Sequence, residues 1–442
     1  MKQPKKRRFQ LNERQLGYAM VAPSIILIAV IIIWPILLSA WNSLFDYRLN
    51  DPSKAERITS LSINLETYAD NRYLVYDTME DVRDTMPGAA NTLNNVTSAL
   101  DEQHETLLKT DEGLADRYEE VNTMLENYQP VNDDDLRLTD IPEAWADGFT
   151  ATLDEQTAAV QALREDAPEG AVQSLTDLES QLSNTKNAVL EPNFVGVQNY
   201  TDYLANGRTW TAMLNTLLFT VVTVGVELAV GMLVALLINR VFIGRGLVRA
   251  AVLVPWAIPT AVAAMMWTFL FDGQSGIMAY YMAQLGIIDD PGVLLSTGAG
   301  GMFSVMFADI WKTTPYMALL LLAGLQTIPR SMYEAAAVDG ANKFQQFFSI
   351  TLPMIRSAIL VAVLFRALDA FRVFDLIYVL TGGGPANSTE SISVYAYKLL
   401  FEQQNFGAGS ALSVIVFLSV ALLSTIFIKL IGSDLFSGRL KQ

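Results

Sequence analysis

Residues 334–353 read EAAAVDGANKFQQFFSITLP and lie between two long apolar segments of the chain. Residues 334–338 are mostly strong helix formers, and Gly340 is well placed to end the short helix that they form. Three phenylalanines follow at helical spacing, and Pro353 opens the next element. The stretch predicts a helix, a sharp turn and a second helix, with small alanine side chains that let a partner surface approach closely. The same pattern also fits an ordinary amphipathic helix lying on a membrane surface.

Around this stretch, six segments are apolar over about 20 residues or more, which is long enough to cross a hydrocarbon core roughly 30 Å thick. The chain has 442 residues, of which only 17% are charged, compared with about 25% in soluble domains. We therefore predict an all-α, polytopic membrane protein with spans at about 16–43, 210–239, 248–271, 301–326, 357–381 and 406–432. A cleaved signal peptide is the alternative for the first span. Its apolar stretch of about 26 residues is longer than the roughly 7–15 residues of a signal peptide.

Lysine and arginine near the span ends predict the orientation of the chain, because these residues are retained on the cytoplasmic side. Both termini and the links after the second and fourth spans are basic, whereas the loop 272–300 has no Lys or Arg. Both termini and the loop 327–356 are therefore predicted to be cytoplasmic, and residues 51–192 to lie outside. The basic residues are Lys2, Lys5, Lys6, Arg7, Arg8, Arg14, Arg240, Arg245, Arg249, Arg330, Lys343, Arg356, Arg439 and Lys441.

Residues 51–192 form a strongly acidic insert. They contain 31 Asp and Glu against 9 Lys and Arg, a net charge of −22, whereas the rest of the chain has 15 against 21, a net charge of +6. Apolar residues recur there every seven positions, as in the seam between packed helices, and turns are predicted at 87–88, 129–142 and 168–170. We predict a bundle of three or four antiparallel helices. The seam residues are Leu93, Leu100, Leu107, Leu114, Val121 and Tyr128.

Composition argues against several functional classes. The chain has no cysteine and a single histidine, His104, which leaves little for a zinc site or a Ser-His-Asp hydrolase. We interpret His104 as a partly buried structural residue, with a metal or catalytic role as the alternative. No Gly-x-x-x-x-Gly-Lys sequence occurs, so the chain does not bind ATP through a P-loop. The acidic insert has no basic stripe, so nucleic-acid binding is not expected.

The loop 327–356 resembles the EAA loop of binding-protein-dependent ABC importers. The resemblance rests on Glu334-Ala335-Ala336, on Gly340 and on the segment ITLP at 350–353. In that family the loop forms a coupling helix that sits in a cleft of the nucleotide-binding subunit. The resemblance therefore implies that the residues coupling this chain to an ATPase are Glu334, Ala335, Ala336, Asp339, Gly340, Leu352 and Pro353.

Further stretches resemble the carbohydrate branch of that family, in particular its larger, maltose- and trehalose-type permease subunit. The resemblance covers about residues 15–50 and 193–435. It implies the six-helix transmembrane fold of type I ABC importers, with the acidic helical bundle inserted after the first helix. The maltose-type subunit also carries a large external domain at that connection, which is β-rich. The stretches are NFVGVQNY at 193–200, AGLQTIP at 323–329, DAFRVFD at 369–375 and LTGGGP at 380–385.

The resemblance also implies partners and location. The chain would be a non-catalytic permease subunit in a bacterial or archaeal cytoplasmic membrane, surrounded by lipid. Its partners would be a second permease subunit in a heterodimer, two ATP-binding subunits and an extracytoplasmic sugar-binding protein. No cofactor is expected in this chain, because ATP and Mg²⁺ would be bound by the ATPase. The implied division is a basic N-terminus (1–15), a first transmembrane helix (16–50), the acidic domain (51–192), a five-helix permease core (193–435) and a cytoplasmic tail (436–442).

Ionisable residues in the fourth and fifth predicted spans are candidates for a substrate path, because charges inside a membrane are costly and usually face a cavity or a partner. Opposite charges three residues apart, such as Arg366 and Asp369, can also pair along a helix, so structural ion pairs are the alternative. Trp311 and Tyr316 offer rings to stack on sugar faces, and Glu227 stands alone in the second span. The resemblance implies a path lined by Asp309, Lys312, Thr313, Tyr316, Arg366, Asp369, Ala370 and Val373.

The predicted function is import of a carbohydrate, a di- or oligosaccharide, with glycerol-phosphate-like substrates as an alternative. An ion-coupled secondary transporter could use intramembrane carboxylates as ion sites, but it leaves the loop 327–356 unexplained. A sensory receptor needs a long cytoplasmic signalling region, and the largest cytoplasmic loop here has only about 30 residues. The acidic insert is predicted to touch the binding protein, with solubility as its alternative role.

Overall fold

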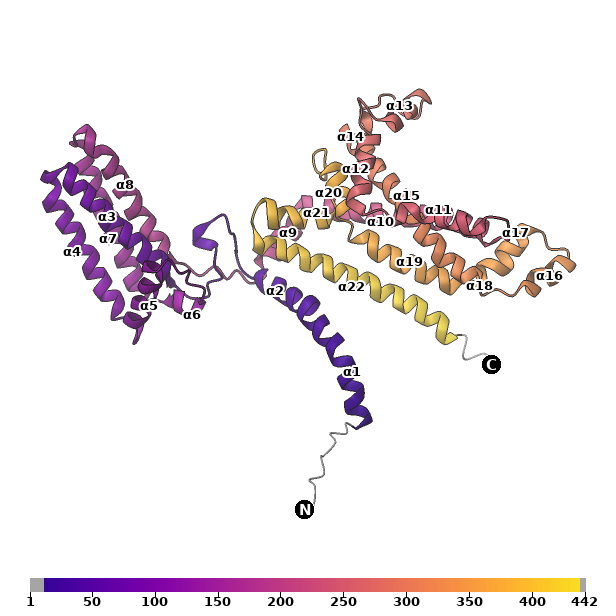
Figure 1. Cartoon of the computed structure of the whole chain (residues 1–442), viewed down its shortest axis with the longest axis horizontal. Coiled ribbons are helices and arrows are strands. Elements are labelled where there is room, and N and C mark those ends of the chain that lie inside the picture. Colours follow the sequence, from indigo (N-terminus) through magenta and orange to yellow (C-terminus); the bar gives the residue numbers. More distant parts are fainter. Residues whose placement is uncertain (1–11, 438–442) are drawn as a thin grey trace, which may run out of the picture. The chain divides into compact units, whose positions relative to one another are not determined.

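The computed structural model describes residues 12–437, and the side chains among them up to residue 429 apart from residue 15. Within this range the chain forms two compact units (Figure 1). The membrane unit contains the described residues up to Ser43, Val197–Gln403 and the described residues from Ala408. The acidic unit contains Leu44–Gly196 and Gln404–Gly407. Most of the basic residues expected at the two termini lie outside the described residues, namely Lys2, Lys5, Lys6, Arg7, Arg8, Arg439 and Lys441.

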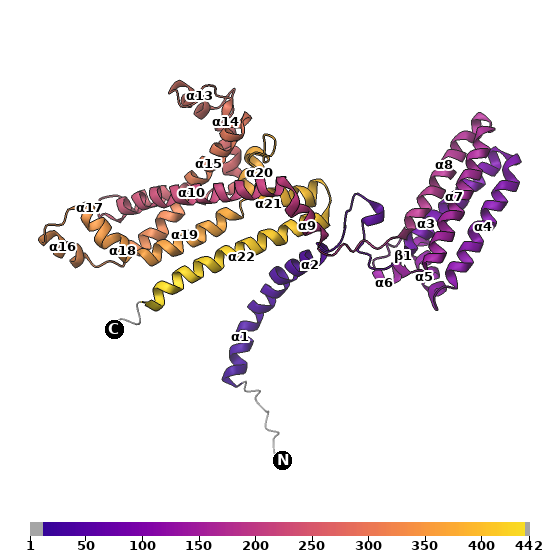
Figure 2. The same ribbon diagram turned by 180° about the vertical axis from the view of Figure 1, so that it is seen from behind.

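Three long helices pack against one another at the centre of the membrane unit (Figures 1 and 2). They are α10 (Gly207–Asn239), α15 (Gly298–Leu325) and α19 (Arg356–Phe371). Apolar side chains such as Phe219 and Leu321 are fully buried between them. The close approach of α10 to α15 requires a small residue, because a Cβ on Gly231 would come within 2.9 Å of the Met317 side chain.

The other helices of the membrane unit surround or extend this core. α16–α18 lie at the end of α10 that is remote from α9 and α21 (Figure 2). At the N-terminus, α1 (Glu13–Ile28), the π turn η1 (Ala29–Ile33) and α2 (Trp34–Asn42) follow one another without a break. The remaining elements are α9 (Gln198–Ala205), α11 (Arg245–Ala257), α12 (Thr260–Leu270), α13 (Ile277–Gln284), α14 (Val293–Ser296), α16 (Arg330–Val338), α17 (Lys343–Gln346), η5 (Phe347–Thr351), α18 (Leu352–Met354), α20 (Asp375–Thr381), α21 (Ile392–Tyr397), η6 (Lys398–Glu402) and α22 (Phe406–Ser437).

By length and composition, three helices among the described residues are able to cross a membrane: Leu16–Asn42, Gly207–Asn239 and Phe406–Lys429. Two further pairs qualify if each bent pair is counted as one span. They are Arg245–Ala257 with Thr260–Leu270, and Lys343–Met354 with Arg356–Phe371. α15 has 28 residues and occupies the fourth predicted span. It carries Asp309 and Lys312 near its middle and falls outside these five segments.

The third and fifth predicted spans are each divided into two helices, α11 with α12 and α19 with α20. α11 and α12 meet at an angle of 88°. Pro259 explains this break, because proline disfavours helical backbone at the preceding residue, and Ile258 is indeed extended at φ −72° and ψ 132°. The fifth predicted span breaks between α19 and α20, where the freed carbonyl of Val373 accepts a hydrogen bond of 2.9 Å from the Ser391 hydroxyl.

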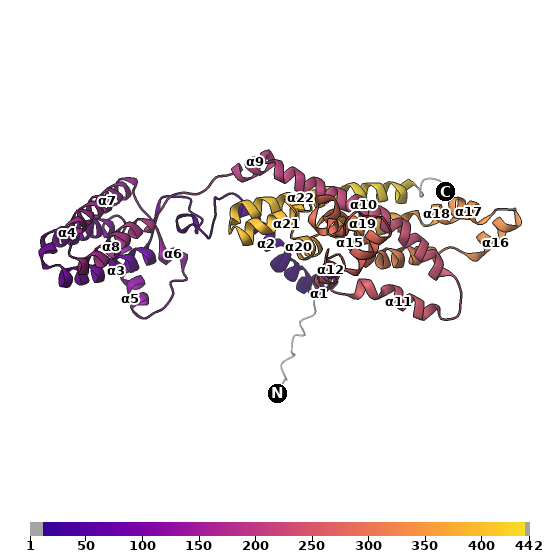
Figure 3. The same ribbon diagram turned by 90° about the horizontal axis from the view of Figure 1, so that it is seen from above.

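Helices also dominate the acidic unit, where α3 packs against α8 and α4 against α7 (Figures 1 and 3). Leu93, Phe149 and Leu178 are among the fully buried residues of its core. A small antiparallel sheet in the order β2-β1-β3 lies in the same unit. The elements are η2 (Pro52–Lys54), β1 (Ser62–Asn64), α3 (Leu65–Thr85), η3 (Pro87–Ala89), α4 (Ala90–Leu108), α5 (Leu114–Glu126), α6 (Asp134–Arg137), β2 (Leu138–Asp140), α7 (Glu143–Glu165), α8 (Glu169–Thr185), η4 (Lys186–Ala188) and β3 (Val189–Leu190).

The prediction of three or four helices in the insert was too simple. Five helices longer than ten residues form it, because the heptad pattern runs across a break between α4 and α5. Five of the six seam residues are buried, but Tyr128 is 97% exposed, so its assignment to the seam was wrong. Tyr128 follows the last turn of α5 with φ 54°, and this left-handed conformation turns the chain out of the seam.

His104 lies on α4 among aromatic rings. Its Nδ1 is 3.2 Å from the Tyr68 hydroxyl, and its ring meets the Tyr118 ring edge-on with 4.7 Å between centroids. Burial lowers the pKa of His104 to about 4, so the imidazole is neutral at pH 7. No group of three or more His, Cys, Asp or Glu that could hold a metal occurs among the described residues. The geometry favours the interpretation of His104 as a packed structural residue.

Candidate substrate cavity and coupling loop

A buried guanidinium connects the three central helices of the membrane unit. Arg366 on α19 is 1% exposed, and its Nε and Nη2 donate to the Glu227 carboxylate on α10 at 2.5 and 2.9 Å. Nη2 also donates to Oδ2 of Asp309 on α15 at 2.5 Å. Burial of these charges is costly unless they are paired and hydrogen-bonded, and here one arginine satisfies two carboxylates from two other helices.

The ion pairs continue along α19 toward solvent. Arg366 Nη1 donates to Asp369 Oδ2 at 3.0 Å, and Arg372 Nη2 lies 3.5 Å from the other Asp369 oxygen. Both pairs have the three-residue spacing that the sequence predicts. On the buried side, the Thr313 hydroxyl lies 2.7 Å from a Glu227 oxygen and 2.6 Å from the Asp309 carbonyl. The cluster therefore runs from a fully buried carboxylate to a half-exposed one.

This cluster forms one wall of a cavity of about 270 Å³. The cavity brings together seven of the eight residues that the sequence places on a substrate path. Tyr316 is the exception: it does not line the cavity, but its ring stacks on that of Trp256, which does, with 5.5 Å between centroids. The lining consists of Trp256, Thr260, Asp309, Lys312, Thr313, Arg366, Asp369, Ala370, Arg372, Val373, Phe374, Asp375 and Leu376.

Sequence reasoning missed Trp256 and left the role of Glu227 open. Glu227 carries the innermost charge, and its only sequence signal is an isolated carboxylate in an apolar span. Trp256 enters the cavity from α11, far from the fourth and fifth spans in sequence. Trp311, a candidate for sugar stacking, instead packs edge-on against Trp267 with 5.4 Å between ring centroids. The two alternatives for the charged residues do not exclude each other, because the same side chains form ion pairs and line the cavity.

The loop 327–356 forms a tight helix–turn–helix. Gly340 follows α16 at φ 84°, and the amide of Gly340 donates to the Ala337 carbonyl at 3.1 Å. The next amide, of Ala341, donates to the Ala336 carbonyl at 2.8 Å, which completes the hydrogen-bond pattern of a Schellman C-cap. Asn342 then begins α17 through a capping box with Gln345. Local sequence is sufficient to define this turn.

The surface of this loop offers small and apolar groups to a partner. Glu334 and Ala335 are exposed on α16, and Ala336 is half-buried. Val338 and Phe344, on either side of the turn, are 87% and 79% exposed. The Tyr333 hydroxyl bonds to that of Thr351 at 2.9 Å and ties α16 to η5. Asp339 and Gly340 are exposed at the turn, and Leu352 and Pro353 form the first turn of α18.

Comparison with known proteins places these features in one family. Residues 227–436 match the family described as binding-protein-dependent transport system inner membrane component. The chain is 42% identical over 239 residues to the trehalose/maltose transport system permease protein MalF of Thermococcus litoralis, covering 54% of this chain and 80% of that protein. It is 45% identical over 255 residues to the trehalose transport system permease protein SugA of Mycobacterium tuberculosis, covering 57% and 80%. The chain belongs to this family of permeases.

A solved structure is also similar to the permease. It is that of a bacterial alginate ABC transporter in complex with an alginate pentasaccharide-bound periplasmic protein, with a TM-score of 0.48 and 24% identity over 53% of this chain and 82% of that chain. The family assignment confirms the predicted all-α polytopic membrane protein and its role as a non-catalytic transport subunit, with ATP hydrolysis in a separate subunit. A substrate-binding protein is a partner of permeases of this family, as the family description states.

A second buried ion cluster in the permease was not anticipated from the sequence. Glu390, fully buried, accepts hydrogen bonds of 2.8 and 2.9 Å from Arg208 and lies 3.0 Å from the Lys398 ammonium. The Arg208 guanidinium also lies over the Tyr395 ring, 4.3 Å from its centroid. These contacts attach the glycine-rich loop after α20 to the first turn of α10. Arg208, Glu390 and Lys398 do not line the cavity.

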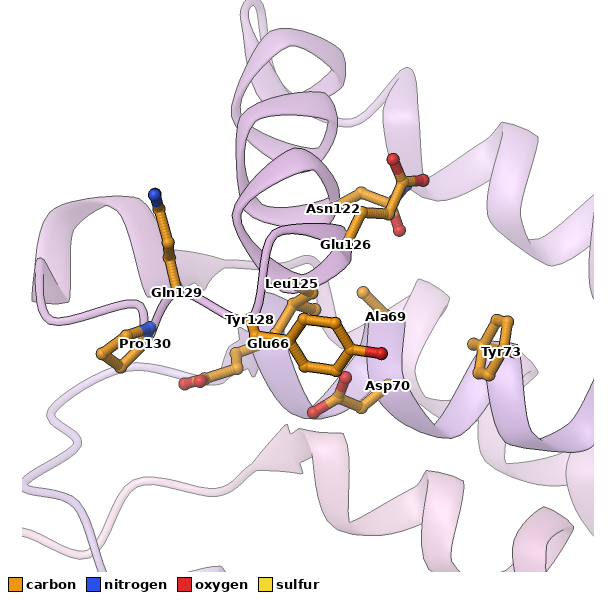
Figure 4. Close-up of a pocket in the computed structure, with 10 residues that line it drawn as sticks. All are labelled: Glu66, Ala69, Asp70, Tyr73, Asn122, Leu125, Glu126, Tyr128, Gln129 and Pro130. Atoms are coloured by element: carbon orange, nitrogen blue, oxygen red, sulfur yellow. The ribbon is translucent and has the colours of Figure 1, made fainter.

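The acidic unit carries a larger pocket of about 620 Å³ (Figure 4). Two well-exposed tyrosines, Tyr73 and Tyr128, border it together with carboxylates, and no basic residue lines it. Burial raises the pKa of Asp70 above its ordinary value. The lining residues are Glu66, Ala69, Asp70, Tyr73, Asn122, Leu125, Glu126, Tyr128, Gln129 and Pro130.

Proposed function

We propose that this permease imports a di- or oligosaccharide that an extracytoplasmic binding protein delivers. The main support for this proposal is the polar cavity at α15 and α19. Hydroxyl, carboxylate and guanidinium groups line it together with the indole of Trp256 inside an apolar helix bundle. Such a combination hydrogen-bonds hydroxyl groups and stacks on the apolar face of a sugar ring. The names of the relatives that transport trehalose and maltose support the same substrate class.

The proposed assembly contains one second permease subunit and two ATP-binding subunits. α16 and the turn at Gly340 would dock into one ATPase, since this loop exposes Ala335 and Val338 for close contact. In this proposal both termini and the loop 327–356 face the cytoplasm, and the acidic unit faces outward. Arg240 lies in the link between α10 and α11, and Arg245 and Arg249 lie in the first turns of α11, so this end of both helices would also be cytoplasmic.

Reconstitution of the whole importer tests this function. The permease would be purified through a tag together with its partner subunits, placed in liposomes, and supplied with binding protein and radiolabelled trehalose or maltose. We expect uptake that requires both ATP and the binding protein. Uptake driven by a proton or sodium gradient without an ATPase would instead identify a secondary transporter. Tight binding of a non-carbohydrate by the cognate binding protein would overturn the sugar assignment.

The aromatic wall of the cavity provides a sharper test. We expect Trp256→Ala to lower uptake by up to about tenfold while the complex still assembles, because a stacked ring contributes about 0.5–1.5 kcal/mol beyond its area burial. Trp210→Ala is the matched control, since Trp210 is half-exposed and does not line the cavity. Initial uptake rates at saturating binding protein measure the effect. Equal rates for the two variants would contradict a substrate path past Trp256.

The acidic unit is proposed to steer the binding protein toward the permease. Its pocket in Figure 4 combines Glu66, Asp70 and Glu126 with exposed tyrosine rings, which suits a basic loop of the partner. Neutralising the three carboxylates as Gln, Asn and Gln should raise the concentration of binding protein for half-maximal transport about threefold at low salt, and less at high salt because salt screens exposed charges.

The control for this experiment neutralises three exposed acids elsewhere in the unit, Glu102, Glu105 and Glu112, each to glutamine. This triple variant has the same net charge but leaves the pocket intact. Equal effects from both variants would mean that only the total charge acts. No effect from either would leave solubility as the role of the acidity.

A further inference from the structure

The break between α19 and α20 has no glycine or proline to explain it. Residues 370–378 contain neither, and among the described residues no side chain caps the first turn of α20. Sharp breaks in helices also arise where a side chain inserts into the hydrogen-bond ladder. Here that side chain is Ser391, whose hydroxyl donates to the Val373 carbonyl at 2.9 Å. In a continuous helix this carbonyl would accept from the amide of Ile377, four residues later.

Ser391 is held so that its hydroxyl meets this carbonyl. The residue is 0% exposed, and its side-chain oxygen accepts a hydrogen bond of 3.2 Å from the Val394 amide, as the N-cap of α21. A hydroxyl group has one proton to donate, and here the proton goes to Val373. One side chain therefore begins α21 and also interrupts the helix between α19 and α20.

Both neighbours of Ser391 are bound to α10. The side-chain amide of Asn215 donates to the Glu390 carbonyl at 3.1 Å, and the Ile392 amide donates to the Thr216 hydroxyl at 3.0 Å. The Glu390 carboxylate is also fixed by the second buried ion cluster. Ser391 is thus part of a buried segment that is anchored on a central helix of the membrane unit.

The break determines which side chains the cavity presents. Five of its thirteen lining residues, 372–376, are consecutive in the sequence and lie at the break. Successive side chains of a continuous helix point about 100° apart, so five in a row cover more than a full turn. They cannot all face the same cavity in that case. The cavity wall therefore depends on the interruption of the helix at Val373.

We propose that Ser391 is a positioning residue of the substrate site. Its hydroxyl keeps the fifth span broken and thereby holds residues 372–376 at the cavity. Ser391 itself is fully buried and does not line the cavity, so it acts through the backbone of Val373 and not on a ligand. The inference rests on the proposed function, since it takes the cavity as the substrate site.

Cysteine labelling of the assembled importer tests this position without any substrate. The chain contains no cysteine, so Asp375→Cys at the exposed rim gives it a single thiol for a water-soluble maleimide. Adding Ser391→Ala should change the labelling rate at least about threefold, because the Val373 carbonyl loses its buried donor and the helix can close across the break. Ser391→Thr keeps a hydroxyl and should leave the rate unchanged. The mass of this chain after timed labelling gives the rate.

Two further variants separate the bond to Val373 from other effects. Ser391→Gly loses the hydroxyl but retains a residue that is favourable at an N-cap, so it should act like Ser391→Ala. Thr389→Val is the matched control on the same buried segment. It removes a hydroxyl that bonds to the Gly384 carbonyl and to Thr381, and it should not change the labelling rate.

Uptake relates the position to transport. With Asp375 intact, Ser391→Ala should lower the uptake rate at saturating binding protein about tenfold, and Ser391→Thr should restore it. The proposal is overturned if Ser391→Ala leaves labelling unchanged, if Thr389→Val changes it equally, or if Ser391→Gly labels as the parent does. If the wild type imports no sugar, the proposed function fails, while the labelling rates still decide whether Ser391 positions this wall.

Discussion

Replacing Arg366 with methionine is expected to destabilise the assembled importer by about 3–5 kcal/mol, because it leaves the buried charges of Glu227 and Asp309 without a partner. Glu227 is 0% exposed and receives two hydrogen bonds from Arg366, so no solvent can replace the lost donor. Thermal unfolding of the purified complex, followed by loss of monodispersity on heating, measures the effect. Uptake should fall to background at temperatures where the wild type is fully active.

Arg372→Met is the matched control for this experiment. The same change of residue type removes a guanidinium that is 69% exposed and lies 3.5 Å from a carboxylate which is itself 58% exposed. We expect a loss of no more than about 1 kcal/mol, as is usual for solvent-exposed ion pairs. Equal destabilisation by both variants would contradict the special role of the buried pair.

A double variant separates lost pairing from lost packing. Glu227→Gln combined with Arg366→Met removes the innermost buried pair and leaves Asp309 as the one buried carboxylate without its arginine, so it should recover about half of the stability lost in Arg366→Met alone. An amide in place of the carboxylate keeps the hydrogen bond from Thr313 within reach. If the double variant is less stable than either single variant, the cost arises from packing and not from an uncompensated charge.

Replacing Gly340 with proline is expected to abolish coupling, with binding-protein-stimulated ATP hydrolysis falling more than tenfold. Gly340 has φ 84°, whereas proline is fixed near −65° and lacks the amide that bonds to Ala337. Gly340→Asn should retain most activity, since asparagine tolerates this conformation. Gly286→Pro is the control: Gly286 also has a positive φ, 69°, but lies on the loop between α13 and α14.

Glu334→Lys tests the same surface without changing the backbone. It reverses an exposed charge in the middle of α16, and we expect the ATPase subunits to co-purify poorly with this variant. If Gly340→Pro and Glu334→Lys both leave assembly and stimulated ATP hydrolysis intact, the loop 327–356 is not the coupling element.

Features that depend on short-range chemistry could be predicted from the sequence. The apolar length of the spans, the separate acidity of residues 51–192 and the turn at Gly340 follow from composition and local backbone preference. The pairing of Arg366 with Asp369 was predictable for the same reason, because side chains three residues apart on a helix are neighbours. The break between α11 and α12 also follows from a local feature, Pro259, but the apolar residues on both sides of it look like one uninterrupted span in the sequence.

The residues that share the cavity are distant in sequence, and helix packing brings them together. Glu227 and Arg366 are 139 positions apart, and their contact depends on how α10 and α19 pack on α15. Trp256, not Trp311, lines the cavity, because helix rotation and the bend between α11 and α12 set the direction of each ring. An isolated charge in an apolar helix indicates that the charge has a partner. Which residue is that partner depends on how the helices pack, and the packing depends on all their side chains together.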